Sequence, residues 1–228
     1  MANELTAVQQ KIAARRENMA ARLEGLGGGS GITTIRTKNR SFVIPPDDTT
    51  VKNNLEVIVL DWALSYNYYD KPYVQGEKAF PVCFAVGQSV NNMIPSDNSP
   101  KKQHPDCATC WANQFGSGAG NAKACQNRIN LAVQIADHGP ESPMYRVSIS
   151  PTALKNWRQY ANALDERGVL AVQVVTRLGF DQNVAYDRLT FAAARKTDKD
   201  ELTEYVNNMD RATEILLMEP KPPADDDE

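Results

Sequence analysis

The stretch HPDCATCWANQFGSGAGNAKAC (residues 104–125) holds three of the four cysteines of this 228-residue chain. The fourth, Cys83, lies upstream in an apolar run. Cys107 and Cys110 form a Cys-x-x-Cys pair, a spacing that lets two thiolates bind one metal ion from a tight turn. Cys125 follows after fourteen further residues, a separation typical of the second half of a zinc site. We therefore predict a four-thiolate zinc site.

The role expected for this zinc is structural. The segment between the ligands is rich in Gly, Asn and Ser, and such a segment needs a staple to hold a shape. A catalytic zinc would need a nearby base, yet the chain has two histidines, His104 and His138, and no Glu between Cys83 and Cys125. His104 is the spare ligand if Cys83 is a core cysteine. An iron–sulfur cluster, two disulfides and free buried thiols are the alternatives.

The net charge of −3 hides a segregation of charge along the chain. Residues 11–40 carry seven basic and two acidic residues, a net of +5, and residues 101–195 carry eleven and seven, a net of +4. The last ten residues carry five acidic residues and one basic, a net of −4. A basic body with an acidic tail is typical of a protein that binds a polyanion. The polar N-terminus and the absence of a long apolar run predict a cytoplasmic protein without a membrane partner.

Composition divides the chain into four parts. A basic amphipathic pattern predicts an N-terminal helix or arm, and a glycine-rich stretch predicts a flexible linker after it. The Pro- and Asp-rich C-terminus cannot pack and is expected to be disordered. The predicted parts are an arm over 1–26, a linker over 27–31, a nucleic-acid-binding domain over 32–218 with a zinc loop over 83–125, and an acidic tail over 219–228.

Within the domain, short alternating runs outnumber helical patterns. Helices are expected over 150–168, where Ser150, Pro151 and Gly168 punctuate the ends, and over 198–218, begun by Thr197 or Asp198. Strands are expected over 32–46 (one or two), 55–60, 80–87, 129–135, 144–150, 169–180 and 184–195, the last two joined by a short turn. The order of elements predicts a mainly β, α+β fold: an OB-like antiparallel barrel with an inserted zinc loop.

Aromatic residues gather near the first buried strand. Aromatics make up 7% of the chain, yet five of them fall within twelve residues between positions 62 and 73. Such a row is either a core face or a platform on which bases stack, and neighbouring basic segments favour the platform. The candidates for stacking are Trp62, Tyr66, Tyr68, Tyr69, Tyr73, Trp111 and Phe115.

These features together predict non-sequence-specific binding of single-stranded nucleic acid and no enzymatic activity. Basic side chains would follow the phosphates while aromatic faces stack the bases, and the tail (Asp225, Asp226, Asp227, Glu228) would occupy the basic groove until nucleic acid displaces it. The candidates for phosphate contact are Arg36, Lys38, Arg40, Lys101, Lys102, Lys123, Arg128, Lys155, Arg158, Arg177 and Arg188.

This layout resembles phage-encoded single-stranded DNA-binding proteins. The resemblance rests on the basic arm, the Cys107-Ala-Thr-Cys110 knuckle, the LDWALSYNYY segment and the DDDE tail. It implies an OB-fold, helix-destabilising protein of DNA replication, recombination and repair. It also implies a structural zinc, an arm that contacts neighbouring subunits and a tail that recruits replication proteins. The chain departs from that family because no histidine leads the ligand order and no aromatic residue ends the tail.

Two rival functions use the same features. A zinc-stapled interaction module, such as a polymerase modulator, would use the knuckle and the tail to bind protein. A nuclease or primase accessory subunit would need paired carboxylates for magnesium, and the nearest set is Asp61 with Glu56 and Asp70, scattered along the aromatic segment. Affinity that falls steeply with salt distinguishes a phosphate-driven binder from a module that docks on protein.

Overall fold

The computed structural model describes residues 32–71 and 79–221. The predicted N-terminal helix and linker, Tyr73 and the four terminal acidic residues lie outside these ranges. None of the helices in the described part of the chain has the length and apolar character that crossing a membrane requires.

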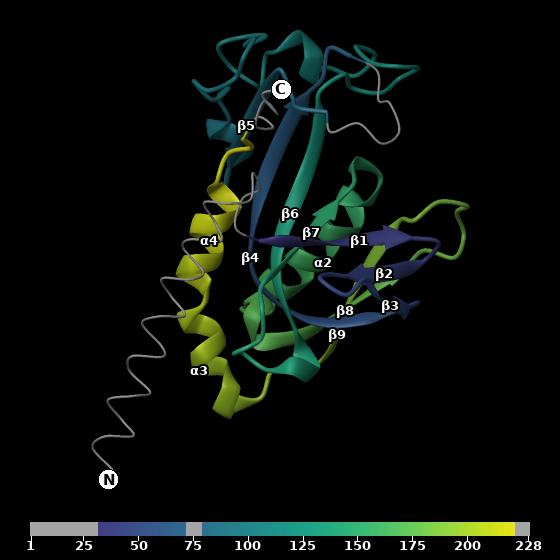
Figure 1. Cartoon of the computed structure of the whole chain (residues 1–228), viewed down its shortest axis with the longest axis vertical. Coiled ribbons are helices and arrows are strands. Elements are labelled where there is room, and N and C mark those ends of the chain that lie inside the picture. Colours follow the sequence, from purple (N-terminus) through teal and green to yellow (C-terminus); the bar gives the residue numbers. More distant parts are fainter. Residues whose placement is uncertain (1–31, 72–78, 222–228) are drawn as a thin grey trace, which may run out of the picture.

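Nine strands form one strongly curled sheet with the order β3-β2-β1-β7-β6-β4-β8-β9, and β5 pairs with β4 beside this path (Figure 1). All pairs are antiparallel except β1 with β7, which is parallel. The strands are β1 (Thr33–Lys38), β2 (Ser41–Ile44), β3 (Thr49–Lys52), β4 (Leu55–Tyr68), β5 (Cys83–Gly87), β6 (Gln126–Ile135), β7 (Tyr145–Ile149), β8 (Val174–Phe180) and β9 (Leu189–Lys196).

The expected α+β class is confirmed, but the sheet is not the wholly antiparallel barrel that we predicted. Its pairing over the described residues is an open path from β3 to β9, so the sheet curls like half a barrel. The parallel contact of β1 with β7 joins segments more than a hundred residues apart, and no local pattern indicates it. Figure 1 shows the result, with β1 to β3 lying across the direction of β4 and β6.

Strand β4 is the centre of the sheet, since it pairs with β5, β6 and β8. It is longer than the predicted strand over 55–60 because the aromatic segment continues it, past a register shift between Val59 and Asp61. Side chains alternate along a strand, so successive residues point to opposite faces of the sheet. Here Tyr66 faces one apolar core, and its neighbours Ser65 and Asn67 face the other side.

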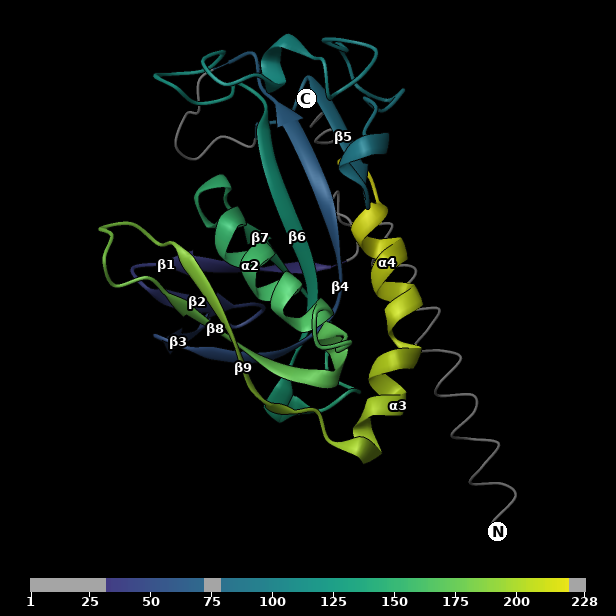
Figure 2. The same cartoon turned by 180° about the vertical axis from the view of Figure 1, so that it is seen from behind.

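Helices cover both faces. Helix α2 (Leu154–Asp165) packs on the main core through Trp157, Tyr160 and Leu164 (Figure 2). Helices α3 (Lys199–Asn207) and α4 (Met209–Leu217) cover the lower part of the opposite face, where they bury a second core with Ile58, Leu60 and Ala132 of the sheet. The upper part of that second face lies beyond the end of α4.

Two predicted boundaries are wrong for tertiary reasons. The helix expected over 198–218 is divided at Asn208, whose side-chain amide donates to the carbonyl of Pro140 at 3.0 Å and to Oε1 of Gln134 at 3.1 Å. The last hairpin has a longer loop than the predicted short turn. The Arg40 guanidinium donates to Gln182 and Val184 of that loop, and Arg188 forms an ion pair with Asp181 at 2.6 Å at its base.

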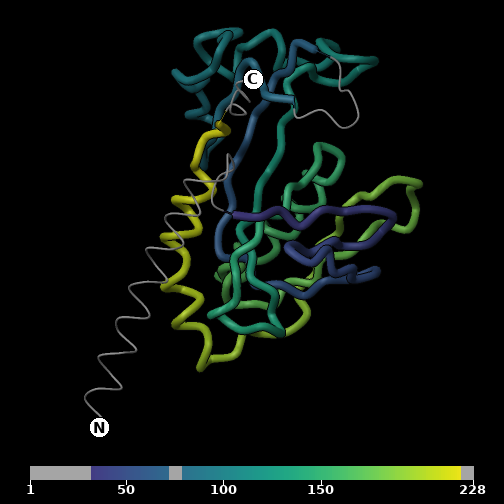
Figure 3. Tube along the Cα trace, viewed as in Figure 1, coloured from purple at the N-terminus to yellow at the C-terminus, as the bar shows by residue number. Residues whose placement is uncertain are grey.

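Short 3-10 helices connect the remaining elements. They lie before α2 and β8, after β6, and in the cysteine loop, which stands at one end of the molecule (Figure 3). Their bounds are Val90–Asn92, Trp111–Asn113, Ala136–His138, Pro151–Ala153 and Ala171–Gln173.

Candidate functional site

The four cysteines line one small internal cavity of about 20 Å³ at the end of β4. Cys83 begins β5, Cys107 and Cys110 lie on the loop, and Cys125 immediately precedes β6. None of the four is in a disulfide. The spacing in sequence therefore becomes proximity in space, with Cys83 as the fourth member of the set.

Backbone hydrogen bonds hold the loop around this cavity. The Cys107 amide donates to the Met93 carbonyl at 3.2 Å, and the Cys125 amide donates to the Ala112 carbonyl at 2.7 Å. The buried side chain of Asn113 also donates to the Cys107 carbonyl at 2.7 Å. The two halves of the cysteine set are thereby fixed against each other.

The thiols affect one another electrostatically. Burial, followed by the neighbouring cysteines, raises the pKa values of Cys107 and Cys125 to about 12. A thiolate in this cavity is disfavoured by desolvation and by other thiolates, and a bound cation relieves both effects. The described residues contain no group of three or more His, Cys, Asp or Glu side chains already placed as ligands around one point. The four thiols line one pocket without being arranged around a single point, and as donors they suit a soft or borderline metal ion.

His104, the predicted spare ligand, is not among the cavity-lining residues. Its Nδ1 accepts a hydrogen bond from the Asp106 amide at 3.2 Å. The hydroxyl of Thr109 lies 3.4 Å from the same nitrogen. His104 therefore stabilises the turn that precedes the knuckle.

Two aromatic side chains project from the cysteine loop. Trp111, directly after the knuckle, is 50% exposed, and its ring meets that of Tyr68 edge-on at 5.5 Å between centroids. Phe115 is 76% exposed, and Nζ of Lys123 lies 5.0 Å from the centre of its ring. The loop thus presents aromatic faces beside a cation.

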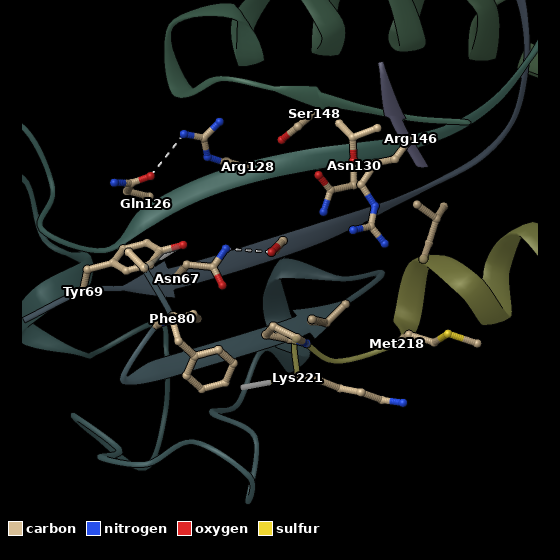
Figure 4. Close-up of a pocket in the computed structure, with 17 residues that line it drawn as sticks. Asn67, Tyr69, Phe80, Gln126, Arg128, Asn130, Arg146, Ser148, Met218 and Lys221 are labelled. Atoms are coloured by element: carbon tan, nitrogen blue, oxygen red, sulfur yellow. Dashed lines mark hydrogen bonds between the residues drawn. The ribbon is translucent and has the colours of Figure 1, made fainter. Parts of the chain in front are cut away.

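A groove of about 420 Å³ occupies the open part of the sheet face beyond α4 (Figure 4). Its floor is polar because the alternation along β1, β4, β6 and β7 directs one set of side chains to this face. The segment before β5, Val86 of β5 and the end of α4 complete its walls. The floor residues are Thr34, Ser65, Asn67, Gln126, Arg128, Asn130, Arg146 and Ser148, and the walls include Tyr69, Phe80, Pro81, Leu216, Met218 and Lys221.

The groove is cationic. Arg128, Arg146 and Lys221 line it, and its described lining contains neither Asp nor Glu. Nη2 of Arg128 donates to Oε1 of Gln126 at 3.1 Å. Burial raises the pKa of the Tyr69 phenol, and the neighbouring Arg128 charge opposes that shift, which places this ring near the cation.

Arg146 is the least compensated of the three cations. Its Nε is buried, and no acceptor for it lies within the described residues. Desolvation lowers the pKa of its guanidinium below the ordinary value. No ion pair to Arg146 is formed by any carboxylate of residues 32–71 or 79–221.

The predicted stacking residues separate into three sets. Trp62 and Tyr66 belong to the main core: Trp62 meets Trp157 edge-on at 6.4 Å, and Tyr66 is only 8% exposed. Tyr68 supports Trp111 and lines the cysteine cavity. Of the described aromatic candidates between positions 62 and 69, Tyr69 is the one that lines the groove, while Trp111 and Phe115 are on the cysteine loop.

Most of the predicted phosphate contacts lie elsewhere. Four of them form ion pairs: Arg36 with Asp48, Lys102 with Asp97, Arg177 with Glu56, and Arg188 with Asp181. Arg40 holds the last hairpin loop. Lys155 and Arg158 are exposed on α2, which covers the other face of the sheet, and Lys38 is exposed at the end of β1. Arg128 lies in the groove, and exposed Lys101 and half-buried Lys123 lie on the cysteine loop.

Sequence reasoning missed Arg146, Lys221 and Phe80. The run MYRVSIS alternates, so Arg146 and Ser148 share the face opposite to Tyr145 and Val147. The alternation indicates which face of the sheet carries Arg146. It does not indicate that the described helices leave this part of the face uncovered.

The carboxylates of the enzyme alternative have different partners. Glu56 pairs with Arg177 at 2.8 Å, while Asp61 accepts from the Trp62 amide at 2.8 Å and from the Thr213 hydroxyl. Asp70 is exposed after the end of β4.

The groove and the cysteine loop share β4 and β6, so both candidate surfaces lie at the same end of the sheet. Comparison of the chain with protein-family models, curated proteins and solved structures finds no match.

Proposed function

We propose that this chain binds single-stranded DNA without sequence specificity and acts in DNA replication, recombination and repair. The observation that carries the proposal is the cationic groove: three basic side chains and two aromatic rings without a carboxylate in the described lining. Phosphates need cations, and unstacked bases need aromatic faces.

The groove chemistry favours a single strand over a duplex. Tyr69 and Phe80 can stack only on bases that are not already stacked in a double helix. The amides of Asn67, Gln126 and Asn130 each both donate and accept, so they suit the edges of any base. Trp111 and Phe115 on the cysteine loop would offer further exposed rings for stacking at the same end of β4.

We include a structural zinc ion in the proposal. Cys83, Cys107, Cys110 and Cys125 would hold it, because four thiols that line one small pocket match the donor set of a closed zinc site. When bound, the ion supplies positive charge that favours the thiolates and cross-links β5, the loop and the start of β6. Cys110, held by the ion, would then fix the backbone of Trp111, which directly follows it.

Finer parts of the proposal concern architecture and partners. An OB-type relationship is supported by the curled sheet and by α2, which precedes the final hairpin. The acidic tail would compete with DNA and recruit replication proteins, and the N-terminal segment would contact neighbouring subunits. We also propose that the chain is related to phage helix-destabilising proteins and that it acts in the cytoplasm.

A protein-interaction module is the second candidate. The exposed rings of Trp111 and Phe115 favour it, because exposed aromatic groups beside a rigid staple are also typical of protein interfaces. Such a module would use the cysteine loop and leave the groove without a ligand.

Fluorescence anisotropy with labelled oligo-dT, at low and high salt and beside a duplex of equal length, tests the proposal. We expect tight, salt-sensitive binding to the single strand and weaker binding to the duplex. No binding at low salt would overturn the proposal and favour the interaction module.

A further inference from the structure

The inner end of the groove surrounds one arginine with hydrogen-bond donors. Arg146 lies there beside Ser148 of the same strand and Asn130 of β6, near α4 (Figure 4). Thr34 of β1 and Lys221, which follows α4, line the same space. Two hydroxyls, one amide and one ammonium group therefore accompany a guanidinium.

This arrangement is unfavourable without an anion. Desolvation of a charge is offset by pairing and hydrogen bonding, yet Nε of Arg146 is buried without an acceptor and Arg146 forms no ion pair within the described residues. A purely structural arginine would be expected to reach a carboxylate or a carbonyl. The planar guanidinium presents a fork of donors that matches a phosphate group.

We propose that Arg146 is the anchor of a dedicated phosphate position at the inner end of the groove. The proposal rests on the proposed function for its physiological ligand, one phosphodiester of a single strand, but the chemistry of the position is that of phosphate in general. Ser148 and Thr34, the register partner of Arg146 on β1, complete the position, while Lys221 lies across the groove on the side of Met218.

The phosphate held by Arg146 is distinct from any held by Arg128. Arg146 pairs with Ala132 across β6 and β7, and Ala132 lies four residues from Arg128. Four residues span about 13 Å of strand, so the two backbone positions are well separated along the groove. Figure 4 shows Arg146 beside α4 and Arg128 beside Gln126. Arg128 therefore belongs to a different phosphate position from that of Arg146.

The first experiment measures thermal unfolding of the full chain in inorganic phosphate against chloride at equal ionic strength. The variants are Arg146→Met and, as a matched control, Arg158→Met on the exposed side of α2. At about four times its Kd, phosphate raises the Tm of a domain of this size by about 2–4 °C through binding alone. Phosphate also stabilises proteins by exclusion, but that increment is common to all variants.

We expect phosphate binding to raise the Tm of the wild type and of Arg158→Met by this amount. We expect Arg146→Met to lack this rise in Tm. In chloride, Arg146→Met should melt no lower than the wild type, since an apolar side chain removes an uncompensated charge. Retention of the full phosphate increment in Arg146→Met would overturn the proposal. If Arg146→Met does not fold, Arg146→Gln provides the same comparison with the same criterion.

A second measurement separates this inference from the proposed function. Arg146→Met should weaken oligo-dT binding at least about tenfold, as expected for loss of a charged hydrogen bond. If the wild type shows the increment but does not bind oligo-dT, the phosphate position stands and the proposed function fails. If oligo-dT binds equally to the wild type and Arg146→Met and no increment is seen, the proposed function stands and the anchor is refuted.

Discussion

Replacement of Arg128 by Gln provides a quantitative test of how the groove binds DNA. The three groove cations, Arg128, Arg146 and Lys221, can each neutralise one phosphate. For single strands, log K falls with log salt by about 0.7 per neutralised phosphate, so the groove contributes a slope of about −2. A fourfold rise in salt then weakens binding through the groove about 20-fold in the wild type and about 7-fold in Arg128→Gln.

The assay is an anisotropy titration of oligo-dT at four or more salt concentrations. The control is Arg177→Gln, because Arg177 is paired with Glu56 at 2.8 Å outside the groove and should leave the slope unchanged. Melting curves of both variants check that the fold is intact. A wild-type slope in Arg128→Gln, or an equal change in Arg177→Gln, would refute the assignment of the phosphate path to the groove.

Three further predictions address the cysteine site, the tail and the loop. Replacing Cys107 and Cys110 by Ser should abolish binding of one zinc ion per chain, measured by mass spectrometry. It should also lower the Tm by about 2–4 °C for each kcal/mol of unfolding free energy that is lost. A metal-free wild type and an unchanged Tm in the variant would contradict a structural zinc. Converting the acids of 225–228 to amides should raise affinity for oligo-dT at low salt, and unchanged affinity would rule out competition by the tail. Phe115→Ala should weaken oligo-dT binding by about 1–3 kcal/mol without loss of stability, whereas the control Tyr186→Ala should not.

Local patterns predicted most of the elements. The alternation of MYRVSIS gave β7, and the proline and glycine that bracket 150–168 gave α2, preceded by a short 3-10 turn. These predictions succeeded because burial of one face imposes a period of two on a strand and about 3.6 on a helix. The predicted element boundaries are wrong where contacts with residues distant in the sequence decide them. Asn208 divides the last helix because its side chain finds partners on β6 and in the loop after it.

The candidate site was predicted unevenly. The four cysteines were identified from spacing alone, and the structure brings them to one cavity, while the zinc itself stays a prediction. Of the groove residues, Arg128 and Tyr69 were among the candidates and Arg146 was not. A list of basic residues does not distinguish Arg177, whose carboxylate partner Glu56 is 121 positions away, from Arg146, which has no such partner in the described chain.

The sequence by itself determined the cysteine set, the period of each strand and the segregation of charge, because these depend on residues close together in the chain. Only the tertiary structure decided which face of the sheet stays open. Helix α4 ends at Leu217, and no helix within residues 32–71 and 79–221 covers the second face above Ala63 and Ala132. Strand register then gathers Arg128, Asn130 and Arg146 on that open face, and register follows from pairing between distant segments.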